Sequence, residues 1–186
     1  MKYFLLAGIL GFVFWTLSEL IEIYLRGYNP AVYYLTTLYH VFAGFGIWGL
    51  HKAQSNDQKN LPSMMGAGTA FIAYVSIIYF PIAVMHSGLS ISAFIKANPI
   101  YRILGGFWFL GMILFGVSLL KTMHFPVWNG VVFLLGSIMF TATPLLGWPV
   151  ILVNITNIVF AATVIFMCFI SLRTLAGASA KNQIRD

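Results

Sequence analysis

The chain has 186 residues, of which 60% are hydrophobic and 8% are charged. Because about a quarter of the residues in a soluble globular domain are charged, this composition excludes a soluble domain and predicts a chain surrounded mostly by lipid. The net charge of +6 comes from few basic residues, so we assign it to membrane orientation and predict no nucleic-acid partner. One cysteine, Cys168, excludes an internal disulfide. A helix needs about 20 apolar residues to cross a bilayer, which leaves room for about six or seven crossings.

The first predicted span covers residues 3–26, and we interpret it as a retained helix because its apolar run is longer than that of a signal peptide. Trp15, Glu19, Glu22 and Arg26 fall on one helical face. An ionised carboxylate in hydrocarbon costs about 2.5–3.5 kcal/mol, so both glutamates should face the bundle, a partner or water. One interpretation pairs Glu22 with Arg26 in the headgroup region. The alternative places Glu19, one turn deeper, in an outward-facing polar cavity.

The second predicted span covers residues 31–51 and follows a tight turn at residues 26–30. His40 lies near its middle, where an imidazole needs hydrogen-bonding partners to offset its lost solvation. Glu19 precedes the turn by about as many residues as His40 follows it, so the two side chains should lie at similar depth. We therefore predict a Glu19–His40 contact that links ligand binding to protons. The alternative is a core histidine with a packing role only.

The third predicted span covers residues 63–85 and contains a proline, Pro81. This proline removes a backbone hydrogen bond and frees the carbonyl group of Ile77. A bend at this point would widen an outer pocket near Tyr79 and His86. The alternative is an ordinary helix kink.

The linker at residues 85–102 differs from the other connections, because its apolar residues share one side at helical spacing, namely Ile91, Phe94 and Ile95. This pattern predicts a short amphipathic helix in the membrane interface, between the third and fourth spans. Arg102 lies at the start of the fourth predicted span, residues 101–121. It is placed to meet a carboxylate of the first span or an anionic headgroup.

The last two predicted spans cover residues 126–146 and 149–172. In the last span, Asn154 and Asn157 share a face, and their amides should hydrogen-bond across the bundle. Small residues recur at helical spacing in three other spans and predict close helix packing: Ala43, Gly46 and Gly49, then residues 66–70, then Gly106, Gly111 and Gly116.

The basic residues predict the orientation of the chain. One side of the membrane carries Lys2, Lys52, Lys59, Lys121, Arg173, Lys181 and Arg185, whereas the other carries Arg26, Lys96 and Arg102. Because cytoplasmic segments are enriched in lysine and arginine, both termini should be cytoplasmic. The predicted fold is an all-α bundle of six transmembrane helices in a bacterial cytoplasmic (inner) membrane. Residues 1–174 form its single domain, and residues 175–186 form a polar cytoplasmic tail, of which residues 177–186 are expected to be disordered.

Two histidines, His51 and His124, are predicted at the cytoplasmic surface. Histidines on two helices can ligate a haem iron axially, so haem b or a metal is one interpretation and two solvated loop histidines are the other. The chain has no haem-attachment, zinc-protease or cysteine-cluster motif, and we predict no cofactor and no catalytic residue. The Glu19–His40 pair is the candidate for acid–base chemistry, so an enzyme is not excluded, although a non-enzymatic function is favoured.

The stretch RILGGFWFLGMILFGVSLLKTMHFPVWNGVVFLLGSIMF (102–140) has a Gly/Trp-rich span, a lysine turn and a Phe-Pro-Trp entry into the next span. It resembles a pattern in small bacterial multi-pass proteins of the DUF4386 type, over about a fifth of the chain. Val127 stands where a basic residue is common in that pattern. The resemblance implies about six helices and no assigned activity, and it transfers no functional residue.

The sequence therefore predicts a polytopic protein that binds or transports a small amphipathic or lipid-like molecule in an outward-facing cavity. The alternatives are a membrane-embedded enzyme or haem- or metal-binding protein, and a structural or protective subunit of a membrane complex. The expected partners are membrane lipids, the small ligand and a partner membrane subunit. The expected ligand-binding residues are Trp15, Glu19, Glu22, His40, Tyr79, His86, Arg102 and Asn157.

Overall fold

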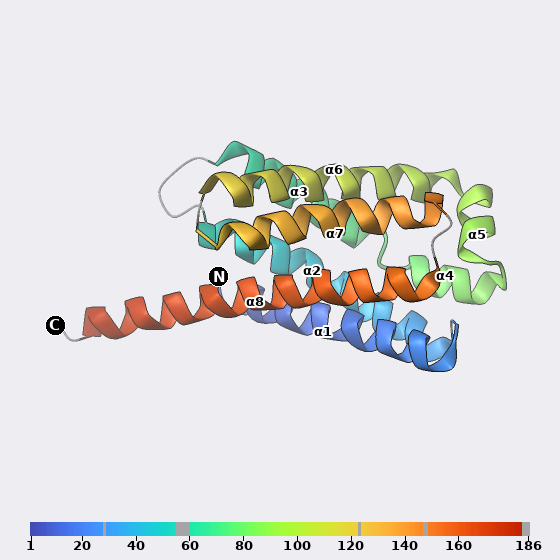
Figure 1. Cartoon of the computed structure of the whole chain (residues 1–186), viewed down its shortest axis with the longest axis horizontal. Coiled ribbons are helices and arrows are strands. Elements are labelled where there is room, and N and C mark those ends of the chain that lie inside the picture. Colours follow the sequence, from blue (N-terminus) through green and yellow to red (C-terminus); the bar gives the residue numbers. More distant parts are fainter. Residues whose placement is uncertain (28, 55–59, 123, 147–148, 184–186) are drawn as a thin grey trace.

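The computed structural model describes residues 1–27, 29–54, 60–122, 124–146 and 149–183, and the regular elements in these ranges are all α-helices. In chain order they are α1 Lys2–Leu25, α2 Pro30–Gln54, α3 Leu61–Ser76, α4 Phe80–Ser87, α5 Ile91–Ala97, α6 Pro99–Thr122, α7 Val127–Leu146 and α8 Val150–Gln183. The long helices run side by side in an elongated bundle (Figure 1). The short helices α4 and α5 lie at one end of it, and both termini lie toward the other.

Four stretches of the described chain are long and apolar enough to cross a membrane: Lys2–Leu25, Leu61–Ser87, Pro99–Thr122 and Val150–Gly177. Their outward surfaces carry exposed aliphatic and aromatic side chains, among them Leu10, Leu17, Leu110 and Phe169. A soluble monomer rarely exposes an apolar surface of this extent. These features support the prediction of an all-helical integral membrane protein, and the all-α class is confirmed.

The third predicted span is divided into two helices, as its proline suggested. The helix breaks at residues 77–79, two residues before Pro81, and α3 and α4 lie on either side of the break. The carbonyl group of Ile77 accepts a hydrogen bond from the backbone N–H of Phe80 at 2.9 Å, which satisfies the group that the proline leaves free. The predicted helix in the linker is also present as α5, where Phe94 packs against the rings of Phe80 and Tyr101.

Glycines set the closest helix–helix contacts. A Cβ atom added to Gly8 of α1 would lie 2.7 Å from the Cα atom of Gly46 in α2, and one added to Gly11 would lie 2.8 Å from the backbone nitrogen of Ala43. Gly111 of α6 meets the backbone of α3 in the same way, with Ala70 at 2.7 Å. The small-residue faces of the second, third and fourth predicted spans are therefore packing surfaces. Gly106 is an exception, since nothing lies within 4 Å of its added Cβ.

The tail prediction is wrong in one respect. The helix α8 continues through residues 177–183, which were predicted to be disordered, and extends beyond the bundle (Figure 1). Alanine, which has the highest helix propensity, recurs at residues 176, 178 and 180, so the apolar span and its polar extension form one continuous element. Lys59 and Arg185, which contribute to the predicted orientation, lie outside the described residues.

Candidate functional site

Two acidic side chains of α1 face two amide side chains of α8. Asn157 donates a hydrogen bond through Nδ2 to the Oε1 atom of Glu19 at 3.0 Å. One helical turn away, Asn154 hydrogen-bonds the side chain of Glu22, and its Nδ2 atom also lies 3.4 Å from the carbonyl oxygen of Glu19. Because residues three apart share a face of a helix, two helices that run in opposite directions bring both pairs into register. We call Glu19, Glu22, Asn154 and Asn157 the carboxyl–amide ladder.

The ladder is deeply buried. Exposed fractions are 7% for Glu19, 6% for Glu22, 1% for Asn154 and 4% for Asn157. Polar groups in this position are costly unless they are hydrogen-bonded, and a carboxamide N–H is a suitable donor to a carboxyl oxygen. The prediction that the acids turn into the bundle is therefore confirmed, as is the prediction that the amides of the last span hydrogen-bond across it.

The deep end of the ladder rests on the aromatic core. Trp15, which is 3% exposed, is a hydrogen-bonding neighbour of the Glu19 carboxyl group. Its ring stacks on Tyr39 with the centroids 4.6 Å apart and meets the edges of Phe140 and Phe160. Trp15 thus holds the lower acid in place from within the core, and it does not line the cavity described next.

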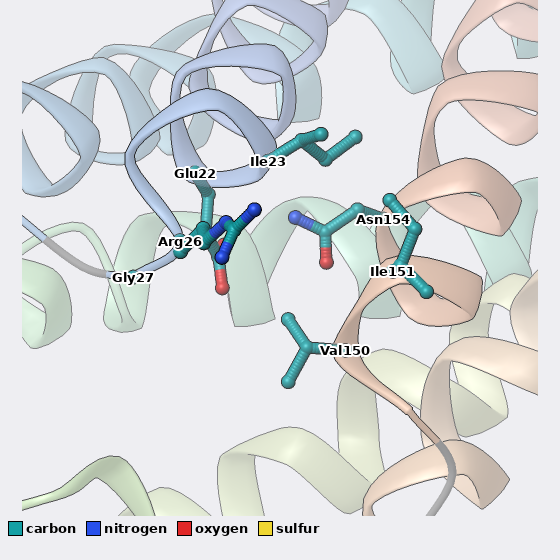
Figure 2. A pocket seen from close by; sticks show the side chains of 7 residues that line it. All are labelled: Glu22, Ile23, Arg26, Gly27, Val150, Ile151 and Asn154. Atoms are coloured by element: carbon teal, nitrogen blue, oxygen red, sulfur yellow. The ribbon is translucent and has the colours of Figure 1, made fainter.

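The shallow end of the ladder opens into a cavity of about 420 Å³ between the end of α1 and the start of α8. Such a volume lies in the range of pockets that hold small molecules. Figure 2 shows Glu22 and Arg26 on the α1 side and Asn154 reaching toward them from α8. The remaining wall is mostly apolar, and the lining residues are Glu22, Ile23, Arg26, Gly27, Val150, Ile151 and Asn154.

Arg26 reaches the cavity because α1 ends at the residue before it. Its backbone is left-handed, with φ 54° and ψ 39°, and it is the non-glycine residue of the described chain with positive φ. This conformation favours glycine and costs other residues of order 1–2 kcal/mol. Sequence spacing placed Arg26 one regular turn after Glu22, which predicted an ion pair. Because its backbone is left-handed, Arg26 does not continue the helical face that carries Glu22. The partner of the Glu22 side chain is Asn154 instead.

The predicted Glu19–His40 contact is wrong. Glu19 faces α8, where Asn157 is its partner, whereas His40 donates through Nδ1 to the backbone oxygen of Thr36 at 2.7 Å. The His40 ring also contacts Tyr74 of α3, with the centroids 6.0 Å apart. A hairpin of equal arms fixes the depth of two residues but not the direction in which each faces, and these two face different neighbours. His40 has the environment of a core histidine, which was the alternative interpretation.

The other predicted ligand residues lie apart from this cavity. Tyr79 is 63% exposed at the break between α3 and α4, and the side chains of His86 and Arg102 are also exposed. The three do not line the cavity between α1 and α8. Their role in binding stays a prediction.

The two histidines considered for haem or metal are also placed separately. His51 is buried and its Nδ1 atom lies 2.8 Å from the hydroxyl of Ser63, in contact with α3. His124 lies in the turn after α6 against the ring of Phe125, and partial burial lowers the pKa of its imidazole from the ordinary 6.5. Among the described residues, no group of three or more histidine, cysteine, aspartate or glutamate side chains is placed to hold a metal ion.

Sequence reasoning missed the apolar wall of the cavity, which consists of Ile23, Val150 and Ile151. Such residues are common throughout the chain, and no pattern separates the ones that line a pocket from those that face lipid. Asn154 was expected to hydrogen-bond across the bundle but was not included among the ligand-binding residues. Its pairing with Glu22 could have been found from the matching three-residue spacings in the first and last spans.

Comparison of the chain with family models, with curated proteins and with solved structures finds no match. The resemblance to proteins of the DUF4386 type therefore stays a prediction.

Proposed function

We propose that the protein crosses a bacterial cytoplasmic membrane six times, with both termini cytoplasmic, and binds a small amphipathic molecule in the cavity between α1 and α8. The observation that carries this proposal is the junction of a buried acid with an apolar-walled cavity. Glu22 is 6% exposed and lines a space of about 420 Å³ together with Ile23, Val150 and Ile151. A polar headgroup and an apolar chain would each find a matching wall there.

The hydrogen-bonding capacity of Glu22 supports a ligand at this position. A carboxylate has about four acceptor sites on its two oxygens, and one amide donor, Asn154, meets this side chain. Tyr33 of α2 lies within electrostatic range of the same carboxyl group, and Glu22 also lines the cavity, where a ligand would supply a further donor. A purely structural acid would be expected to use this capacity within the bundle, because the cost of an unsatisfied buried charge is high.

The position of the cavity supports an outward-facing site. It lies at the end of α1 and the start of α8, which is the end of the bundle that also holds α4 and α5 and is opposite to both termini. The excess of lysine and arginine assigns the terminal side to the cytoplasm. A ligand would then enter from the outer leaflet or the outer aqueous phase. The same site would serve a transporter, a transporter subunit or a binding protein.

Native mass spectrometry of the protein in a mild detergent tests this proposal, with two variants that are matched in position and exposure. Ile151 lines the cavity and is 46% exposed, whereas its neighbour Leu152 is 45% exposed and does not line it. Ile151→Trp should fill the cavity and remove the bound small molecule, whereas Leu152→Trp should leave it bound. Equal retention in both variants, or no bound molecule in the wild type after addition of lysophosphatidylcholine, would show that the ladder is a structural contact between helices.

A further inference from the structure

The charges that line the cavity also identify the class of headgroup, an inference that rests on the proposed function. The cavity carries one acidic side chain, Glu22, and one basic side chain, Arg26. Glu22 is buried and bonded to Asn154 of the opposite helix, whereas Arg26 is exposed at the end of α1. We propose that the cavity binds a zwitterionic amphiphile, with its ammonium group at Glu22 and its phosphate or other anionic group at Arg26.

Electrostatic matching favours a zwitterion over a singly charged head. In a site walled mostly by apolar side chains, a charge without a counter-charge is costly. A cationic head would satisfy Glu22 and meet the guanidinium of Arg26 with the same sign. An anionic head would satisfy Arg26 and be repelled by Glu22. A zwitterion whose two charges are joined by a short linker matches both residues at once.

The depth of the two charges sets the direction of the ligand. Glu22 is 6% exposed and belongs to the regular part of α1, whereas Arg26 lies outside the helix, in the left-handed residue that follows it. The ammonium group would therefore lie on the buried side of the head and the anion at the mouth. Guanidinium groups also suit phosphate oxygens geometrically, because their N–H donors bind two oxygens at once.

An apolar stripe on α8 continues from the cavity and fits an alkyl chain. Ile151 lines the cavity, and Ile155 and Val159 follow it at successive four-residue steps, which places the three on one face of the helix. Their side chains are 46%, 48% and 51% exposed, respectively. The tail of a bound amphiphile would lie along this stripe. The stripe therefore favours an amphiphile over a free zwitterion such as an amino acid.

The test uses five probes with native mass spectrometry of the detergent-solubilised full chain. Four carry one saturated sixteen-carbon chain and differ in the head: lysophosphatidylcholine, a monoacylglycerol, an alkyltrimethylammonium and a lysophosphatidylglycerol. The fifth is free phosphocholine, which has the head without the chain. The wild type should retain lysophosphatidylcholine about tenfold or more above the other probes, as expected for the loss of one charge-assisted contact.

Charge-removing variants make the assignment specific. Glu22→Gln should abolish the preference for the zwitterion over the anionic probe, and Glu22→Asp should largely keep it. Arg26→Gln should abolish the preference over the cationic probe. Arg173→Gln removes an exposed arginine that does not line the cavity and should leave all preferences unchanged. Arg26→Gly, whose backbone conformation is unstrained, replaces Arg26→Gln if the latter does not fold.

The outcomes separate the two proposals. Equal retention of the zwitterionic and uncharged probes, unchanged by Glu22→Gln and Arg26→Gln but lost in Ile151→Trp, would overturn the zwitterion assignment and leave the amphiphile cavity standing. A wild-type preference for the cationic or anionic probe would overturn the assignment in the same way. Binding of free phosphocholine as tight as that of the lysolipid would overturn the role of the apolar stripe. Retention of all probes in Ile151→Trp would overturn the cavity itself.

Discussion

The two ends of the bundle each bury a polar cluster, and the clusters differ in how completely they are paired. One cluster lies where α2 and α6 end and α3 begins. There the side chain of Gln54 donates to Ser63 at 2.6 Å and to Ser118 at 3.3 Å, and it accepts from Thr122 at 3.0 Å. His51 adds a fourth contact, to Ser63 at 2.8 Å. We call these five residues the Gln54 network. It joins α2, α3 and α6, and its hydrogen bonds run from helix to helix.

The carboxyl–amide ladder uses the same kind of interhelical hydrogen bond but stays open on one side. Its lower pair, Glu19 and Asn157, is enclosed by the core, and its upper pair, Glu22 and Asn154, lines the cavity. The comparison shows that burial of a polar group in a membrane protein does not by itself indicate a ligand site. The useful distinction is whether the hydrogen-bonding capacity is used up inside the bundle or remains directed into a space.

The largest effect that we expect comes from disrupting the Gln54 network. Gln54→Leu should lower the free energy of unfolding by about 2–4 kcal/mol, because it removes three hydrogen bonds and leaves three hydroxyl groups without that partner. The measurement is the midpoint of unfolding in detergent. Retention of lysophosphatidylcholine, measured below that midpoint, should not change. A loss of binding at unchanged stability would mean that the two ends are not independent.

Disrupting the lower pair of the ladder, Glu19 and Asn157, should also lower the free energy of unfolding, but by less than disrupting the Gln54 network. Asn157→Leu removes the amide that donates to the Glu19 carboxyl group at 3.0 Å and should cost about 1–2 kcal/mol of stability. Thr156 is a suitable control position because it is only partly buried and its hydroxyl bonds to the carbonyl group of Leu152 in its own helix. Thr156→Val should change the unfolding midpoint little. Equal effects of the two substitutions would show that the Glu19–Asn157 bond contributes nothing to the fold.

The sequence predicted the helices well because the length of each apolar run and the turn residues between the runs determine them. Apolar runs long enough for a bilayer, separated by proline and polar turns, set the limits of α1, α2, α6 and α7 to within a few residues. The break before Pro81 followed from the missing backbone N–H of proline. The cost of exposing a carboxylate to hydrocarbon was enough to turn Glu19 and Glu22 into the bundle.

The partners of the inward residues could not be predicted in the same way. Depth along a helix follows from counting residues, but the direction of a side chain depends on how each helix is rotated against its neighbours. Glu19 and His40 were therefore paired by depth, although one faces α8 and the other contacts α3. An outward-facing cavity was predicted, but its place between α1 and α8 was not, for a related reason. Arg26 lines this cavity from a left-handed residue after the end of α1, and a left-handed arginine has no signal in the sequence.

Relief of the strain at Arg26 is expected to have a smaller effect of the opposite sign. Arg26→Gly places the residue that tolerates φ 54° at the end of α1 and should raise the free energy of unfolding by up to about 1 kcal/mol. The same variant should lose the preference for lysophosphatidylcholine over the cationic probe. Gain of stability with loss of selectivity would identify the strained arginine as a binding residue retained at a cost to stability. A loss of stability would indicate instead that the guanidinium group holds the end of α1 in place.

The smallest effect that we expect is a pH dependence of stability at His124, which should not affect ligand binding at the cavity. Partial burial lowers the pKa of His124 below the ordinary 6.5, so the folded protein holds this proton more weakly than the unfolded chain does. The contribution to stability is therefore fully present above pH 6.5 and decreases as the pH falls below that value. His124→Gln should flatten this part of the pH profile of the unfolding midpoint. The measurement runs from about pH 7.5 to about pH 5, which brackets the usual pKa of histidine. Because His124 lies in the turn after α6, far along the chain from the residues that line the cavity, the substitution should leave the order of amphiphile preference at neutral pH as it is in the wild type.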